Sequence, residues 1–149
     1  MADFRHPIPT SLILTSACLL AAIGCGAGNS AAQVKGRVIC KGGPLPAAGV
    51  RMVRLEPTAD STAAIRKGAS GSINDDGTFE LYTRKPGDGV LPGKYAVTFA
   101  FYSGAMDHRS LIPAKYAKAA TTPHQLTVEE DIDDLELEIE TTGVAAAAR

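Results

Sequence analysis

Hydrophobic and polar residues alternate along most of the chain between residues 33 and 140. In the segment 94–102, for example, Tyr95, Val97, Phe99 and Phe101 occupy every second position. A period of two is typical of a β-strand with one buried face and one face in water. The pattern predicts strands in seven segments, which are 33–41, 50–57, 70–74, 78–83, 94–102, 125–130 and 135–140.

Turn-forming residues separate these segments. Asp76-Gly77, between 70–74 and 78–83, is a strong signal for a tight hairpin in which Phe79 and Leu81 share a face. The longer connections contain too many Pro and Gly residues for the crossover helices that a parallel sheet requires. The pattern therefore predicts an all-β fold, a seven-stranded antiparallel Greek-key β-sandwich, with an open barrel as the alternative.

A different pattern precedes the strands. Residues 11–24 form an apolar run without a charged side chain. The run ends in Ala22, Ile23 and Gly24, and Cys25 follows directly. The run is too short for the roughly 20 residues that span a bilayer, but it has the length of the apolar region of a signal peptide. Its end resembles the bacterial lipobox, although Ala22 stands where that motif usually has Leu. The resemblance implies that Cys25 becomes the first residue of the mature protein and carries diacylglycerol and palmitate-like acyl chains. The alternative is an ordinary secretory signal that leaves Cys25 as a free thiol.

These segments divide the chain into four parts. We expect a lipoprotein signal peptide at 1–24, a flexible spacer at 25–32 beginning with the lipidated Cys25, a β-domain at 33–140 and a disordered tail at 141–149. Several acyl chains on one cysteine hold a protein stably at a membrane. This predicts a protein of the bacterial cell envelope that is attached to a membrane by its lipid. We expect it at the periplasmic or surface face of the outer membrane rather than at the inner membrane.

Composition narrows the function. The chain has 149 residues, with 15 Lys+Arg against 16 Asp+Glu, which indicates one domain, expected to be a monomer. The absence of a basic tract argues against nucleic-acid binding, which needs clustered Lys and Arg. The three cysteines are Cys18, Cys25 and Cys40. Since Cys18 lies in the signal segment and Cys25 carries lipid, we expect no intramolecular disulfide, and we expect Cys40 to fill a strand position.

The order of short motifs in 33–140 resembles that of bacterial lipoproteins with a carboxypeptidase regulatory-like domain, a transthyretin-like or prealbumin-like β-sandwich. The matching motifs are 34–38 with 43–45, 48–50 with 53–57, 75–79, 87–89 with 91–95, and 112–116 before 126–128. The resemblance implies an accessory, structural or adhesive module. It does not imply the activity of the transthyretin-like 5-hydroxyisourate hydrolases, because those end in Tyr-Arg-Gly-Ser and this chain ends in TTGVAAAAR.

Candidate catalytic residues are few. His108 and His124 lie on predicted loops without the spacing of a zinc site, and we interpret both as exposed loop residues. No serine stands in a GxSxG motif. We expect no enzymatic activity and no cofactor.

Acidic residues gather in the last strand, where 129–140 contains eight of them. Alternation places the glutamates of 135–140 on a solvated face, and we expect basic residues of the first strand to lie across from them, namely Lys35, Arg37 and Lys41. A divalent-cation site is a weak alternative, with the candidate ligands Asp75, Asp76, Asp131, Asp133 and Asp134.

Two functions of different classes follow. The first is a lipid-anchored, non-enzymatic structural or interaction module. The second is a small-ligand or carbohydrate-binding module that uses the loops 83–93 and 103–124, with Tyr82, Tyr102 or Tyr116 as stacking surfaces. An aromatic content of 5% without any Trp favours the first.

Overall fold

The computed structural model of the protein describes residues 30–61 and 63–142. The predicted signal peptide at 1–24 lies outside these residues. The described part contains β-strands and one short 3₁₀ helix, and it contains no α-helix. The elements are β1 (Val34–Cys40), β2 (Val50–Pro57), β3 (Ala69–Ser72), β4 (Thr78–Leu81), β5 (Gly93–Tyr102), η1 (Ala114–Ala117), β6 (Gln125–Val128) and β7 (Ile132–Ile139).

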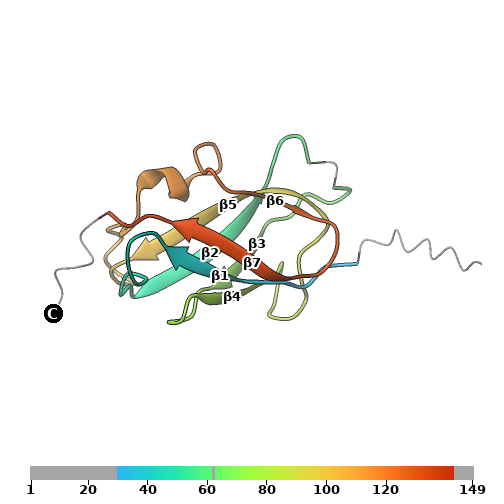
Figure 1. Ribbon diagram of the computed structural model, residues 1–149. Helices are drawn as coiled ribbons and strands as arrows, with labels where there is room; N and C mark the ends of the chain where they lie inside the picture. Colours follow the sequence, from blue (N-terminus) through green and yellow to red (C-terminus); the bar gives the residue numbers. More distant parts are fainter. Residues whose placement is uncertain (1–29, 62, 143–149) are drawn as a thin grey trace, which may run out of the picture.

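The strands form two sheets. One sheet has three strands in the order β4-β1-β7, and the other has four in the order β3-β2-β5-β6. Figure 1 shows the sheets as two layers that lie against each other, and buried side chains from both form one core. The prediction of an all-β fold is confirmed, and the two layers are consistent with a sandwich.

The pairing of β1 with β7 differs from the prediction. The two strands are parallel, with Val38 opposite Leu137 and Cys40 opposite Ile139. The expectation of a purely antiparallel sandwich is therefore wrong at this pair. Antiparallel order is natural for strands joined by a short hairpin, whereas β1 and β7 are the first and last strands, so the rest of the domain connects them. Alternation identifies the buried face of each strand but not the direction of its neighbour.

The predicted hairpin around Asp76-Gly77 forms, but its two arms join different sheets. Its turn is closed by the Gly77 N–H, which donates to the Asn74 carbonyl at 3.0 Å, and Gly77 has a positive φ of 87°. Beyond the turn, Ser70 and Tyr82 exchange two backbone hydrogen bonds. β3 then pairs with β2, and β4 pairs with β1. The hairpin thus links the two layers.

β5 supplies the centre of the core. Tyr95, Val97, Phe99 and Phe101 all lie on the buried face, as the alternation predicts. The opposite face of β5 is also buried, because Thr98 is only 2% exposed. That face carries the small residues Ala96 and Ala100, and the Thr98 hydroxyl donates to the Glu56 carboxylate at 3.2 Å. The strand is therefore covered on both sides.

The fold begins before the predicted boundary at residue 33. Ala32, which the sequence places in the predicted spacer, is 4% exposed and exchanges two backbone hydrogen bonds of 2.8 Å with Val90. Gly89 lies beside this contact with a positive φ of 71°. The structure therefore includes Ala32 in the β-domain. The tail 143–149 lies outside the described residues.

Candidate functional site

Cys25 itself lies outside the described residues, but the structure shows where the chain that follows it enters the fold. Entry is at the end of the sandwich formed by residues 58–61 and 63–68 of the first connection, by the second connection 82–92 and by the third, 129–131, on the right in Figure 1. Ala32 forms a β-bridge with Val90 of the second connection. Gln33 follows, and its backbone N–H donates to the Asp131 carboxylate of the third connection at 2.7 Å. Ala32 and Gln33 are thus held at this end by two loops.

Asp88 organises the loop beside the entry point. Its carboxylate accepts hydrogen bonds from the backbone N–H groups of Thr83 at 2.9 Å, Arg84 at 3.0 Å and Lys85 at 3.1 Å. Partial burial of the carboxyl acts to raise its pKa, but these N–H groups outweigh that effect and hold the pKa below its ordinary value. The sequence reading missed this role, although a single Asp within a Pro-Gly-rich loop is a recognisable signal for such a turn.

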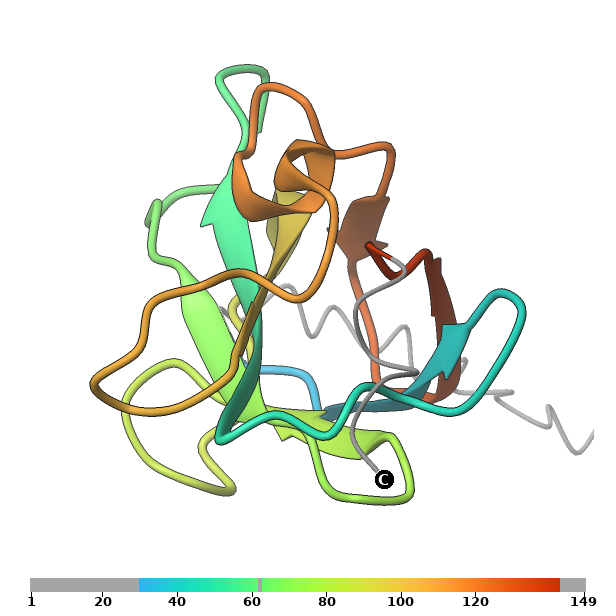
Figure 2. The same cartoon turned by 90° about the vertical axis from the view of Figure 1, so that its left-hand side faces the viewer.

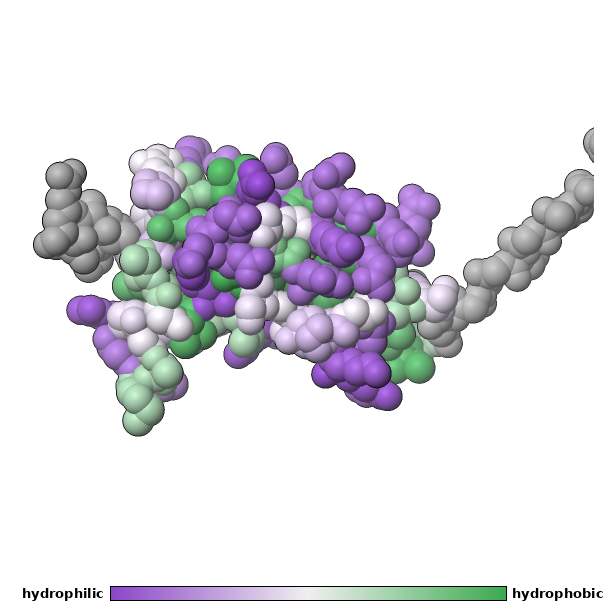
Figure 3. Space-filling view, turned by 90° about the horizontal axis from the view of Figure 1, so that it is seen from below, coloured by the Kyte–Doolittle hydropathy of each residue, from purple (hydrophilic) through white to green (hydrophobic). Residues whose placement is uncertain are grey.

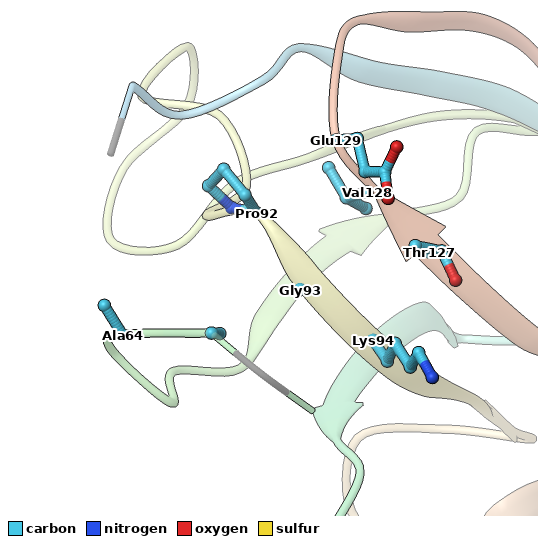
Figure 4. A pocket seen from close by; sticks show the side chains of 8 residues that line it. Ala64, Pro92, Gly93, Lys94, Thr127, Val128 and Glu129 are labelled. Atoms are coloured by element: carbon cyan, nitrogen blue, oxygen red, sulfur yellow. The ribbon is translucent and has the colours of Figure 1, made fainter. Parts of the chain in front are cut away.

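A depression of about 310 Å³ lies at the same end of the molecule (Figure 4). Its charged groups are Lys94 and Glu129, and Lys94 also pairs with Asp60 at 3.2 Å. Buried Ser61 accepts the Lys94 backbone N–H at 3.0 Å and thereby fixes the rim. The lining residues are Ala63, Ala64, Pro92, Gly93, Lys94, Thr127, Val128 and Glu129. This set offers charge and hydrogen bonds, and it includes no aromatic ring, histidine or thiol.

The connection 103–124 uses its aromatic residues within the fold. Tyr116 of η1 is 3% exposed and meets Phe99 edge-on, with ring centroids 6.1 Å apart. His124 stacks on Tyr116 at 5.8 Å. The prediction of Tyr116 as a ligand-stacking surface is wrong, because the ring is part of the core. The sequence reading missed this, since Tyr116 lies in a connection without strand periodicity.

His124 is not an exposed loop residue, in contrast to the prediction. It is half-buried, and its Nε2 lies 2.7 Å from the Glu138 carbonyl oxygen. A carbonyl oxygen only accepts hydrogen bonds, so Nε2 carries the ring hydrogen, and this N–H donates a hydrogen bond to the Glu138 carbonyl of β7. Two residues further on, the Glu140 backbone N–H donates to the Tyr116 hydroxyl at 3.2 Å. His124 thus binds a backbone group of β7, and Tyr116 binds the backbone of the residue that directly follows β7.

The remaining predicted loop residues do not join them. His108 is exposed, as predicted, and lies beside the half-buried Tyr102 with ring centroids 5.7 Å apart. Tyr82 is half-buried next to β4. The loops 83–93 and 103–124 are joined to opposite ends of β5. Figure 2 looks onto the end of the molecule where the loop 103–124, in orange, is attached. The structure does not bring the two loops together into one site.

The acidic candidates for a cation site bind different partners or lie in different parts of the domain. Asp75 forms an ion pair with Arg51. Asp76 accepts the backbone N–H of Thr78 at 2.9 Å and its hydroxyl, and these bonds lower the pKa of Asp76. Asp131 accepts from Gln33, as described above. Asp133 and Asp134 line a hollow that also contains Arg37. Within residues 30–61 and 63–142, the carboxylates do not gather into a group of three that could hold a metal ion.

The predicted charge pairing between the first and last strands is found in part. Arg37 lies opposite Glu136 in the β1–β7 register. Lys41 approaches Glu138 at 4.0 Å, with both side chains mostly exposed, so this pair contributes little stability. Lys35 lies opposite Glu80 of β4 instead. The shorter pair joins Glu140 to Lys115 at 2.9 Å, and it was not foreseen because Lys115 lies outside the strands.

Cys40 occupies a buried position at the end of β1, as predicted. It is 8% exposed and free, and desolvation by burial raises the pKa of its thiol. A raised pKa disfavours the thiolate, which is the reactive form. Cys40 is therefore suited to packing.

Comparison with known proteins gives no match, whether to a protein-family model, to a curated protein or to a solved structure. Within the part of the chain that the structure describes, no helix is both long and apolar enough to cross a membrane.

Proposed function

We propose that the chain is a lipid-anchored protein of the bacterial cell envelope and that its β-domain is a non-enzymatic structural or interaction module. One observation carries the proposal: the apolar run 11–24 leads directly to Cys25, and only residues 26–31 separate Cys25 from Ala32, which forms a β-bridge with Val90. An extended chain covers at most about 3.5 Å per residue, so Ala32 lies within about 25 Å of Cys25. A lipid on Cys25 would hold the domain close to the bilayer.

The chemistry of the described residues supports a non-enzymatic role. The nitrogen Nε2 of His124 is bound to β7, and the Cys40 thiol is buried. The depression in Figure 4 has no nucleophilic thiol or imidazole in its lining. The described histidine and cysteine side chains are therefore bound within the fold or lie apart from this depression, and its charged groups are Lys94 and Glu129.

We further propose that the fold is the seven-stranded Greek-key sandwich of carboxypeptidase regulatory-like, transthyretin-like domains. The strand orders β4-β1-β7 and β3-β2-β5-β6 support it, because the chain passes repeatedly from one sheet to the other. The motif 75–79 lies at the turn between β3 and β4, and the motif 87–89 lies in the loop before β5. Motifs of the resemblance thus coincide with connections between the layers.

The expectation of a monomer is also retained as a proposal. An open strand edge offers unpaired backbone groups to another chain. Along β7, His124 and Tyr116 bind the Glu138 carbonyl and the Glu140 N–H. These bonds cover part of an edge that would otherwise favour association.

The ligand-binding alternative is not proposed, since Tyr116 is buried and the two loops lie apart.

The anchor is tested by replacing Cys25 with alanine in the bacterial host, with Cys40→Ala as the matched cysteine control. Wild type and Cys40→Ala are expected to incorporate a fatty-acid label, to fractionate with membranes and to accumulate a larger precursor with globomycin. Cys25→Ala is expected to lose the label and the globomycin shift, because only the thiol at that position accepts the lipid. Equal labelling and fractionation of Cys25→Ala would refute the anchor.

A further inference from the structure

The end of the sandwich where the tether enters carries exposed basic residues around an exposed apolar one. Ile65 is 52% exposed, which makes it one of the few large hydrophobic side chains on the surface. It lines a hollow of about 250 Å³ together with Lys67, Arg84 and Ala31, the residue before the β-bridge at Ala32. Lys85 is exposed next to Arg84. We call Ile65, Lys67, Arg84 and Lys85 the basic face.

The charge of this face is largely uncompensated. Within the described residues, no ion pair involves Lys67, Arg84 or Lys85. The carboxylate in the same hollow is Asp88, which attracts Arg84 and is bound to backbone N–H groups of its own loop. Three cations thus stand against one carboxylate. The face is suited to an anionic partner.

Acidic residues at the same end lie in a separate hollow. Glu129, Glu130 and Asp131 line it together with Thr127 and Ile132. Asp60 is paired with Lys94. The end of the sandwich therefore has a basic half and an acidic half. Figure 3 shows apolar and strongly hydrophilic residues side by side where the described chain begins.

We propose that the basic face docks on the anionic lipid headgroups of the membrane that holds the anchor. This inference rests on the proposed lipidation of Cys25. Residues 1–29 lie outside the structure and join it at Ser30, so the tether from Cys25 reaches the domain beside this face. A short tether keeps Lys67, Arg84 and Lys85 within reach of the headgroups, where each basic side chain adds attraction to an anionic surface.

The proposal gives the domain a defined orientation. Ile65 enters the interfacial layer, as exposed apolar side chains do in peripheral proteins. The acidic half tilts away from the anionic surface because like charges repel. The connection 103–124, at the other end of β5, faces away from the bilayer (Figure 1). Lipid and basic residues together form the two-part signal that holds a peripheral protein stably.

The experiment uses the full chain, purified from the bacterial host in detergent and reconstituted into vesicles of phosphatidylcholine with or without phosphatidylglycerol. Flotation reports whether the chain is attached, and lysine acetylation read by mass spectrometry reports the orientation. Lys67 and Lys85 are expected to react several-fold more slowly on vesicles that contain phosphatidylglycerol, and high salt is expected to abolish this protection. Lys118, directly after η1, is the internal control and is expected to react equally on both.

A variant separates the basic face from general membrane proximity. In Arg84→Glu, Lys67 and Lys85 are expected to lose their protection, whereas in the matched Lys118→Glu variant they keep it. Equal reactivity of Lys67 and Lys85 on both kinds of vesicle, in a chain that floats, would overturn the docking and leave the anchor standing. A chain that does not float would refute the anchor, and the docking proposal would fall with it.

Discussion

Replacing Tyr116 with alanine is expected to lower the free energy of unfolding by about 3–5 kcal/mol, as for other buried aromatic residues. The ring is 3% exposed, it packs against Phe99 and His124, and its hydroxyl accepts the Glu140 N–H. Truncation removes these contacts together and opens the free edge of β7. For a domain of this size the melting temperature falls by more than about 10 °C.

Two further variants make this result specific. Tyr116→Phe keeps the ring and loses the hydroxyl, so we expect a loss of about 1 kcal/mol. Tyr102→Ala removes a half-buried tyrosine from the end of β5, and we expect a loss of about 1 kcal/mol. Thermal unfolding followed by circular dichroism measures all three. A Tyr116→Ala protein as stable as Tyr102→Ala would contradict the assignment of Tyr116 to the core and reopen its role as a ligand surface.

Replacing Gly71 with alanine is expected to cost about 3 kcal/mol, at the upper end of the range for overpacked sites. Gly71 lies in β3 at the point where β4 crosses it, and a Cβ there would overlap the carbonyl oxygen of Glu80. Because the obstacle is backbone, no side-chain rotation relieves the overlap. The two arms of the hairpin would have to separate, and the link between the sheets would weaken.

Gly43→Ala is the matched control for this substitution. Gly43 lies in the connection after β1, and an added Cβ there meets nothing within 4 Å. We expect a change within about 0.5 kcal/mol. Chemical denaturation measures both variants. A Gly71→Ala protein as stable as Gly43→Ala would show that β3 and β4 do not approach each other as closely as described.

Local patterns in the sequence predict the strands and their buried faces. Phe99 and Phe101 lie in the core because they alternate with the small residues of β5, and the turn at Gly77 forms because only Gly accepts its backbone conformation readily. Both features depend on neighbours in the chain. A single sequence is sufficient for them.

Features that depend on distant residues were not predictable in the same way. Two such features are the parallel alignment of β1 with β7 and the placement of β3 and β4 in different sheets. Both are decided by how the layers stack. Tyr116 reaches the core, and His124 packs against it, because η1 lies beside β5, and no periodicity in 103–124 predicts this. The hydrophobic pattern indicates which face of a strand is buried, but it does not indicate which element packs against that face.

In the candidate site, too, one part is predictable from a local motif and another part depends on the fold. Cys25 is predicted from a local motif, and its place in the mature protein follows from that motif alone. The basic face needs the fold, since Lys67 and Arg84 belong to different loops that the structure brings to one hollow beside Ala31. Neither loop is notable in the sequence.

The central claim is that Cys25 is the lipid-bearing first residue of the mature protein. It is tested most directly by mass spectrometry of the N-terminal peptide of the protein isolated from the bacterial membrane. The predicted result is a peptide that begins at Cys25, lacks residues 1–24 and is heavier than its sequence by a diacylglyceryl group with its acyl chains. A mature N-terminus at another residue, or an unmodified Cys25, would contradict it.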